Sequence, residues 1–119
     1  MTLASQRAIY SPRSLNRLRH RLELVAQEEA DIILKKVIKL FPAVKEITLR
    51  FADEPDTAMI EAELSPDAEI LVRDKELILF VFNIHERAKE APDYRARVRR
   101  LMIEELGDIV GVDFGGEED

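Results

Sequence analysis

The first forty residues place hydrophobic side chains at helical spacing. Ser11 can cap a helix whose first position is Pro12, and apolar residues then recur every three or four positions. These residues are Leu15, Leu18, Leu22, Val25, Ile32, Ile33, Val37 and Leu40. The polar stretch 27–29 either interrupts this pattern or faces solvent. The pattern therefore predicts one long helix or two shorter ones, ending at residues 41–42, where a proline follows a phenylalanine.

From residue 44 onward the spacing changes to two, which is typical of strands. Ile47, Leu49 and Phe51 alternate with polar residues and predict a strand with one buried face. Residues 59–64 and 69–72 predict two further short strands, separated by turns that contain proline and aspartate. Residues 77–82 are apolar at every position, as expected of an interior strand that is covered on both faces. Helices must therefore cover this sheet.

After a polar connection at 83–91, the sequence predicts a last helix over residues 94–110 that stops near Gly111. At about 100° per residue, Glu105 falls in the middle of its apolar face. The other members of this face are Tyr94, Val98, Leu101, Met102, Ile109 and Val112. A carboxylate is costly to bury, so we expect Glu105 to have a partner, a raised pKa or a catalytic role. Ile103 and Val110 are expected on the opposite, exposed side, as a second contact surface.

The order of helix, three or four strands and helix predicts an α+β domain, in which a small mixed sheet packs against the N- and C-terminal helices. A length of 119 residues with 46% hydrophobic residues fits one such domain. We expect residues 1–22 to form a basic helical extension, residues 23–114 the domain, and residues 115–119 a flexible acidic tail.

Charge is unevenly distributed along the chain. The extension contains five arginines and no acidic residue, although the whole chain has a net charge of −6. Such a segment can dock on the acidic domain of its own or another copy, bind nucleic acid, or act as a targeting peptide. Docking is the simplest interpretation, because it needs no outside ligand. Arg13, Arg17 and Arg21 are the candidates for contacting a protein partner or a nucleic acid.

Other classes of chemistry find little support in the composition. The absence of cysteine excludes disulfides and thiolate metal sites, and it points to the cytoplasm. The apolar run at 77–82 is far shorter than the roughly 18 residues that cross a bilayer, so we expect no membrane partner. The sequence has no glycine-rich phosphate loop, no Ser-His-Asp order that two histidines could satisfy, and no aromatic and basic strand pattern for RNA.

The segment 97–111 resembles the terminal helix of the minimal zincin-like metallopeptidases, a bacterial family in which this helix carries His-Glu-x-Gly-His-x-x-Gly. Glu105, Gly107 and Gly111 match this motif. The upstream order is also similar, with a helix, a strand that leads into an acidic Glu-Pro turn, and an Ile-Leu-Phe strand. The resemblance covers about residues 24–114. It implies a minimal zincin-like fold, and it makes Glu105 the vestigial general base.

The two zinc-ligand positions of the motif hold Glu104 and Asp108 instead of histidine. Ligands four residues apart lie one turn above each other and can share one ion. Carboxylates would favour calcium, magnesium or manganese over zinc. Three hypotheses follow. The acids are simply solvated or paired with arginines and no cofactor binds; or Glu104, Glu105 and Asp108 hold a hard cation together with Asp113; or zinc is bound by a set that recruits His85 or His20.

We favour the first hypothesis, in which the chain is a catalytically inactive zincin-like domain that acts through protein interaction or self-association. One alternative is a metal-dependent, peptidase-like hydrolase with an all-carboxylate site. Another is a nucleic-acid-binding protein that uses the basic N-terminal segment. The positions of His20 and His85 in the fold do not follow from the sequence.

Overall fold

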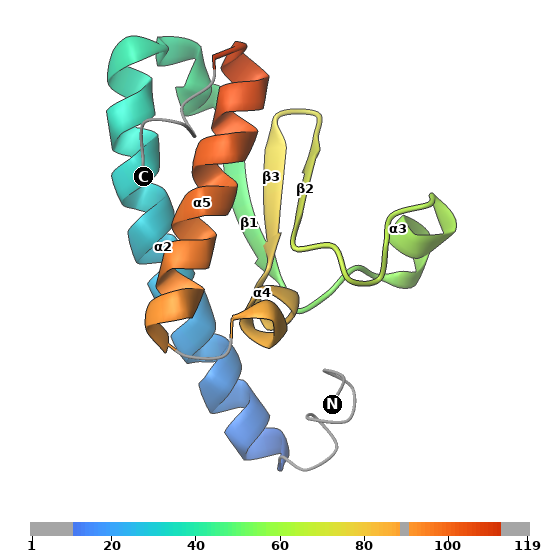
Figure 1. Cartoon of the computed structure of the whole chain (residues 1–119). Coiled ribbons are helices and arrows are strands. Elements are labelled where there is room, and N and C mark those ends of the chain that lie inside the picture. The colour runs from blue at the N-terminus through green and yellow to red at the C-terminus, as the bar shows by residue number, and fades with distance from the viewer. Residues whose placement is uncertain (1–10, 89–90, 113–119) are drawn as a thin grey trace.

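The computed structural model describes residues 11–88 and 91–112, and among these residues a pair of long helices lies side by side across one face of a small sheet (Figure 1). The fold belongs to the α+β class, as predicted. Its elements are α2 (Pro12–Leu40), the 3-10 helix η1 (Pro42–Glu46), β1 (Thr48–Ala52), α3 (Thr57–Glu61), β2 (Ile70–Arg73), β3 (Glu76–Phe80), α4 (Val81–Arg87) and α5 (Ala91–Val110).

Within the described residues, the sheet has three strands in the order β1-β3-β2 and is mixed. β1 pairs with β3 in parallel, with Thr48 opposite Glu76, and β2 pairs with β3 in antiparallel, with Ile70 opposite Leu79. Asp74 and Lys75 join β2 to β3, and both have positive φ angles, of 47° and 65°. Two successive residues with positive φ match the twist of the flanking strands, so they close a tight hairpin. β3 is therefore the central strand.

β3 is covered on both faces, as its uninterrupted apolar sequence predicted. Leu77 and Leu79 pack into the main core with α2 and α5. Ile78 and Phe80 face the other side, where they form a smaller cluster with Met59 of α3. The second face is thus covered by α3 and its neighbouring segment, while the two long helices share the first face.

Residues 59–64 do not form the predicted strand, because α3 occupies residues 57–61. Asp56 caps this helix, and its side chain accepts a hydrogen bond of 2.8 Å from the backbone N–H of Met59. Glu63, with a φ of 69°, then turns the chain away from the helix. A helix of little more than one turn contains barely more than one helical period, too little for a pattern to repeat, so its sequence resembles an alternating strand.

The predicted strand 77–82 ends at Phe80, and the predicted polar connection 83–91 is partly helical, because α4 follows β3 directly. Val81, Phe82 and Ile84 are all buried, so the apolar run continues from the strand into the helix. Asn83 is also buried, and its amide donates hydrogen bonds of 2.8 Å to the carbonyl oxygens of Pro66 and Ala68. Periodicity cannot separate a buried strand from a buried helical turn.

α2 is one continuous helix of 29 residues, which decides between the two alternatives for the first element. The boundary expected between residues 22 and 23 falls inside it, and Leu22 belongs to the main core. The hydroxyl of Tyr94 on α5 donates a hydrogen bond of 2.8 Å to the carbonyl of Leu22. α5 ends at Val110, and the next residue, Gly111, has a φ of 75°, the left-handed conformation expected of a helix stop. The acidic tail at 115–119 lies outside the described residues.

Candidate functional site

Glu105 does not lie at the centre of the buried face of α5, so this prediction is wrong. The buried row runs through Tyr94, Val98, Met102 and Leu106, at steps of four residues. Because 3.6 residues make one turn, each step of four advances the row by about 40° around the helix. By the level of Glu105, the row has moved to one side. The Glu105 side chain is consequently at the edge of the core and half-buried.

The same rotation reverses the two faces expected at the end of α5. Ile103, which we expected to be exposed, is buried, and Val110 packs against the main core. Ile109 and Val112, which we expected to be buried, are 42% and 39% exposed. The last turn of α5 therefore presents hydrophobic side chains to solvent, although not the ones expected from the sequence.

The carboxylates of Glu104, Glu105 and Asp108, which occupy the positions of the zincin-like motif, interact mainly by repulsion. Burial raises the pKa of Glu105, and the nearby charges of Asp108 and Glu104 raise it further. Glu104 and Asp108 are both exposed. Among the described residues, no side chain or backbone group donates a hydrogen bond to the carboxylate of Glu105. Arg97, which could have paired with Glu104, instead donates to Glu69 at 2.7 and 2.6 Å.

These acids do not converge on one point. Within residues 11–88 and 91–112, no three histidine, aspartate or glutamate side chains form a group that could hold a metal ion. Asp113, the expected fourth ligand, lies outside the described residues. His20 is exposed on α2, and His85 lies beside Tyr94, with the two ring centroids 6.3 Å apart. His85 is thus about three helical turns from Glu105 along α5.

Arg13, Arg17 and Arg21 are all exposed on the first turns of α2, where their spacing of four places them in one row. Arg19 behaves differently. Its guanidinium donates hydrogen bonds of 2.7 and 2.8 Å to both carboxylate oxygens of Asp53, and it lies over the ring of Phe82. This paired geometry is a strong form of ion pair, and it joins the basic start of α2 to the end of β1. Nothing in the sequence pattern indicated this pair.

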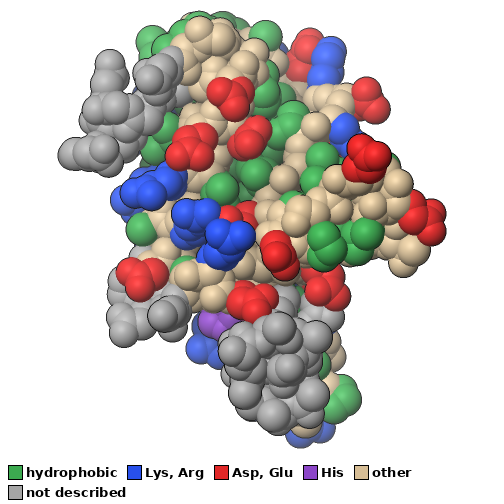
Figure 2. All heavy atoms as spheres, turned by 45° about the vertical axis from the view of Figure 1, so that its right-hand side comes forward, with side chains coloured by type: hydrophobic (Ala, Val, Ile, Leu, Met, Phe, Trp, Pro, Cys, Tyr) green, Lys and Arg blue, Asp and Glu red, His purple; other side chains and the backbone are tan. Residues whose placement is uncertain are grey.

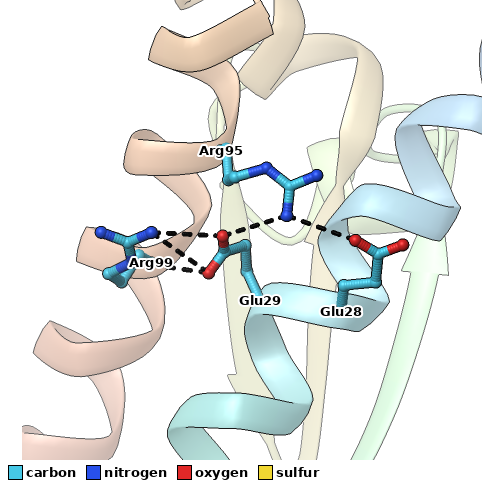
Figure 3. A network of polar contacts seen from close by, with 4 residues as sticks. All are labelled: Glu28, Glu29, Arg95 and Arg99. Atoms are coloured by element: carbon cyan, nitrogen blue, oxygen red, sulfur yellow. Dashed lines mark hydrogen bonds and ion pairs between the residues drawn. The ribbon is translucent and has the colours of Figure 1, made fainter.

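A second set of charges missed in the sequence connects α2 to α5 (Figure 3). Glu29 is only 3% exposed, and it accepts hydrogen bonds of 3.2 Å from both Arg95 and Arg99. Arg95 also contacts the exposed Glu28, at 3.3 Å. Burial by itself would raise the pKa of Glu29, but the bonds from Arg99 and Arg95 outweigh it and hold the pKa below its ordinary value. This network fixes how the two long helices lie against each other.

A hollow that we call the histidine pocket lies between the first turns of α2 and the start of α5. It has a volume of about 470 Å³ and is lined by Leu18, Arg21, Leu22, Val25, His85, Tyr94 and Arg95. Burial lowers the pKa of His85, and the positive charge of Arg21 lowers it further. The imidazole is therefore mainly neutral at pH 7. The pocket combines an apolar wall with three side chains that carry nitrogen donors.

A second hollow, which we call the apolar groove, lies at the opposite end, where α2 and α5 both finish. Its volume is about 560 Å³, and its lining consists of residues 40–44 with Glu46, Ile47, Val72, Lys75, Ile109 and Val110. The two charged members form an ion pair of 2.9 Å, and the rest are apolar. Leu40 is 71% exposed at its border. Figure 2 shows hydrophobic side chains at the surface in the upper region of the molecule, with both acidic and basic side chains beside them.

No protein-family model matches the chain, and comparisons with curated proteins and with solved structures likewise gave no match. The resemblance to minimal zincin-like metallopeptidases thus stays a prediction. Among the residues that the structure describes, no helix is both long and apolar enough to span a bilayer.

Proposed function

We propose that this protein is a non-catalytic binding module, and that the apolar groove takes a short segment of a partner protein. The observation that carries the proposal is the groove itself, which combines about 560 Å³ of space with a largely apolar lining. Contiguous apolar surface of this kind is costly to leave in water and commonly marks an interaction site. Pockets of this volume are also typical of binding sites.

The chemistry around the groove favours an occupant with a large apolar side chain flanked by carboxylates. Lys39 and Lys45 are exposed, and each adjoins lining residues in the sequence. Neither lysine has an ion-pair partner among the described residues. These positive charges stand out in a chain whose net charge is −6. Opposite charges beside an apolar contact speed association and fix its register, so an acidic segment suits this surface better than a basic one.

The binding role has more support than the hydrolase alternative. The charges that act on Glu105, those of Asp108 and Glu104, have the same sign as its own, and the described acids form no cluster suited to a cation. On the zincin-like hypothesis, the chain retains the shape of a peptidase but carries carboxylates at both ligand positions. We keep the cytoplasm as the expected location, because the sequence contains no cysteine.

A selection from a random peptide library displayed on phage tests this proposal. We expect the selected peptides to share one large apolar residue with aspartate or glutamate on either side. In amide chemical-shift mapping, a synthetic peptide of this kind should perturb residues around Leu40, Ile47 and Ile109. Recovery of peptides without an acidic preference would contradict the proposed partner chemistry.

Two isoleucines of nearly equal exposure provide a matched pair of variants. Ile109 lines the groove and is 42% exposed, whereas Ile60 lies on α3 and is 41% exposed. Ile109→Asp should weaken binding of the selected peptide at least tenfold, because it places in the apolar lining a charge of the same sign as the peptide's carboxylates. Ile60→Asp should leave the affinity unchanged. Equal affinity of the peptide for wild type and Ile109→Asp would show that it binds elsewhere and overturn the proposal.

A further inference from the structure

We propose that the histidine pocket is a separate site, which binds a small organic monoanion: a carboxylate attached to an aliphatic or aromatic body. The pocket lies near the start of α5, whereas the apolar groove lies at its end. The proposal therefore does not depend on the groove or on its partner.

The apolar wall of the pocket would hold the body of the ligand. Leu18, Leu22 and Val25 come from successive turns of α2, so they present one continuous hydrophobic strip. The Tyr94 ring faces this strip from α5, and its hydroxyl is already engaged by the carbonyl of Leu22. What Tyr94 offers to a ligand is therefore its ring. A volume of about 470 Å³ is within the range that accommodates small molecules.

The polar lining selects the charge of the ligand. Among the described residues, Arg21, His85 and Arg95 are the only polar members of the lining besides the Tyr94 hydroxyl, and none of the lining residues is acidic. Glu23 influences Tyr94 electrostatically but does not belong to the lining. A carboxylate would accept hydrogen bonds from such donors, whereas an ammonium group would meet only repulsion from the arginines.

Of the two arginines, Arg21 is the better partner for the anion. Arg95 already contacts Glu28 and Glu29, at 3.3 and 3.2 Å, so much of its charge is neutralised. Arg21 has no ion-pair partner among the described residues, and its charge acts on His85 across the pocket. The neutral imidazole can donate one further hydrogen bond. A charge-assisted bond to Arg21 and a bond to His85 would fix the carboxylate at one end of the hydrophobic strip.

Three ligands with the same six-carbon chain test this inference: hexanoate, hexan-1-ol and hexylamine. Each is titrated into ¹⁵N-labelled full-length protein at pH 7 and followed by amide chemical shifts. We expect hexanoate to perturb residues around Leu22, His85 and Tyr94, and to bind about tenfold more tightly than hexan-1-ol. Hexylamine should bind more weakly than both.

Variants on the exposed arginine row provide the control. Arg21→Gln should abolish the preference for hexanoate over hexan-1-ol, whereas Arg17→Gln, one turn earlier on α2, should preserve it. The inference is overturned if hexan-1-ol binds as tightly as hexanoate to wild type, or if both variants behave alike. It is also overturned if hexanoate perturbs the groove residues Leu40 and Ile109 instead. No result at the histidine pocket decides whether a peptide binds at the groove, so the two proposals can fail separately.

Discussion

Among the described residues, Glu29 is the only charged one that is buried. It is 3% exposed, while its partners Arg95 and Arg99 have side chains that are 41% and 47% exposed. Water can therefore hydrate the two guanidinium groups but not the carboxylate. A charge buried in this way is stable only while its donors remain in place.

We predict that Glu29→Gln lowers the free energy of unfolding by about 2 kcal/mol, because it removes the charge that both arginines bind. Glu28→Gln is the matched control, since Glu28 is 51% exposed and shares only Arg95; its effect should be below about 0.5 kcal/mol. Urea denaturation at pH 7 measures both. Equal losses in the two variants would show that burial is not what gives Glu29 its importance.

The stability difference between wild type and Glu29→Gln should also depend on pH. Because the pKa of Glu29 is lower in the folded chain than in the unfolded one, its ionised form stabilises the fold above the unfolded pKa of about 4.3. This contribution is lost as the pH falls through the lower, folded pKa. The difference between wild type and Glu29→Gln should therefore be largest near pH 7 and shrink below about pH 4.

Ionisation of Glu105 has the opposite effect on stability to ionisation of Glu29. The pKa of Glu105 is raised in the folded chain, so ionisation at neutral pH weakens the fold, and this cost disappears below about pH 4. We predict that Glu105→Gln stabilises the protein by roughly 0.5 kcal/mol at pH 7, the size of like-charge repulsion on a helix. Thermal unfolding at pH 7 and pH 4 measures the effect. A clear loss of stability at pH 7 would instead mean that the carboxylate has a bound partner.

Among the helices and strands, the sequence predicted those whose patterns repeat and missed those that are short. α2 and α5 show several helical periods and β1 alternates between apolar and polar residues, so their type was clear, while β3 was recognised by its uninterrupted apolar run. α3 and α4 have five and seven residues, and their type is set by particular contacts rather than by a period. Asp56 caps α3, and the amide of Asn83 on α4 reaches two carbonyls of an earlier loop.

At the candidate site, the sequence pattern likewise did not predict contacts between residues that are far apart in the chain. Glu29 lies 66 and 70 positions from its two arginine partners, a separation at which sequence spacing carries no information. The prediction for Glu105 was wrong for a local reason. A projection at a fixed 100° per residue places the buried side chains on one straight face of the helix, but the side chains that pack against the core follow a row that winds around α5. The motif resemblance proposed Glu104, Glu105 and Asp108 as site residues, and the way α5 packs decides that Glu105 is half-buried while the other two are exposed.

Across the domain, the basic start of α2 is held to an acidic side chain of the same chain. The bidentate bond between Arg19 and Asp53 connects it to the end of β1. This contact agrees with the interpretation that the basic segment docks on its own domain. It leaves Arg13, Arg17 and Arg21 exposed.

We predict that Asp53→Asn loosens the first turns of α2 without unfolding the core. Loss of the charge weakens the bond to Arg19, so local opening of this end becomes easier. In hydrogen exchange, amides at positions 14–20 should exchange several-fold faster than in wild type, while amides at positions 33–37 should keep their rates. Uniform acceleration across α2 would show that the helix opens as one unit.

The central place of β3 has a consequence for protein synthesis. In the described part of the chain, β1 and β2 do not pair with each other, and each pairs only with β3. β1 and β2 are translated first, so neither can form its strand pairing until residues 76–80 of β3 have left the ribosome. Nascent chains that stall before this point hold two exposed edges and no sheet, a condition that favours aggregation and chaperone capture.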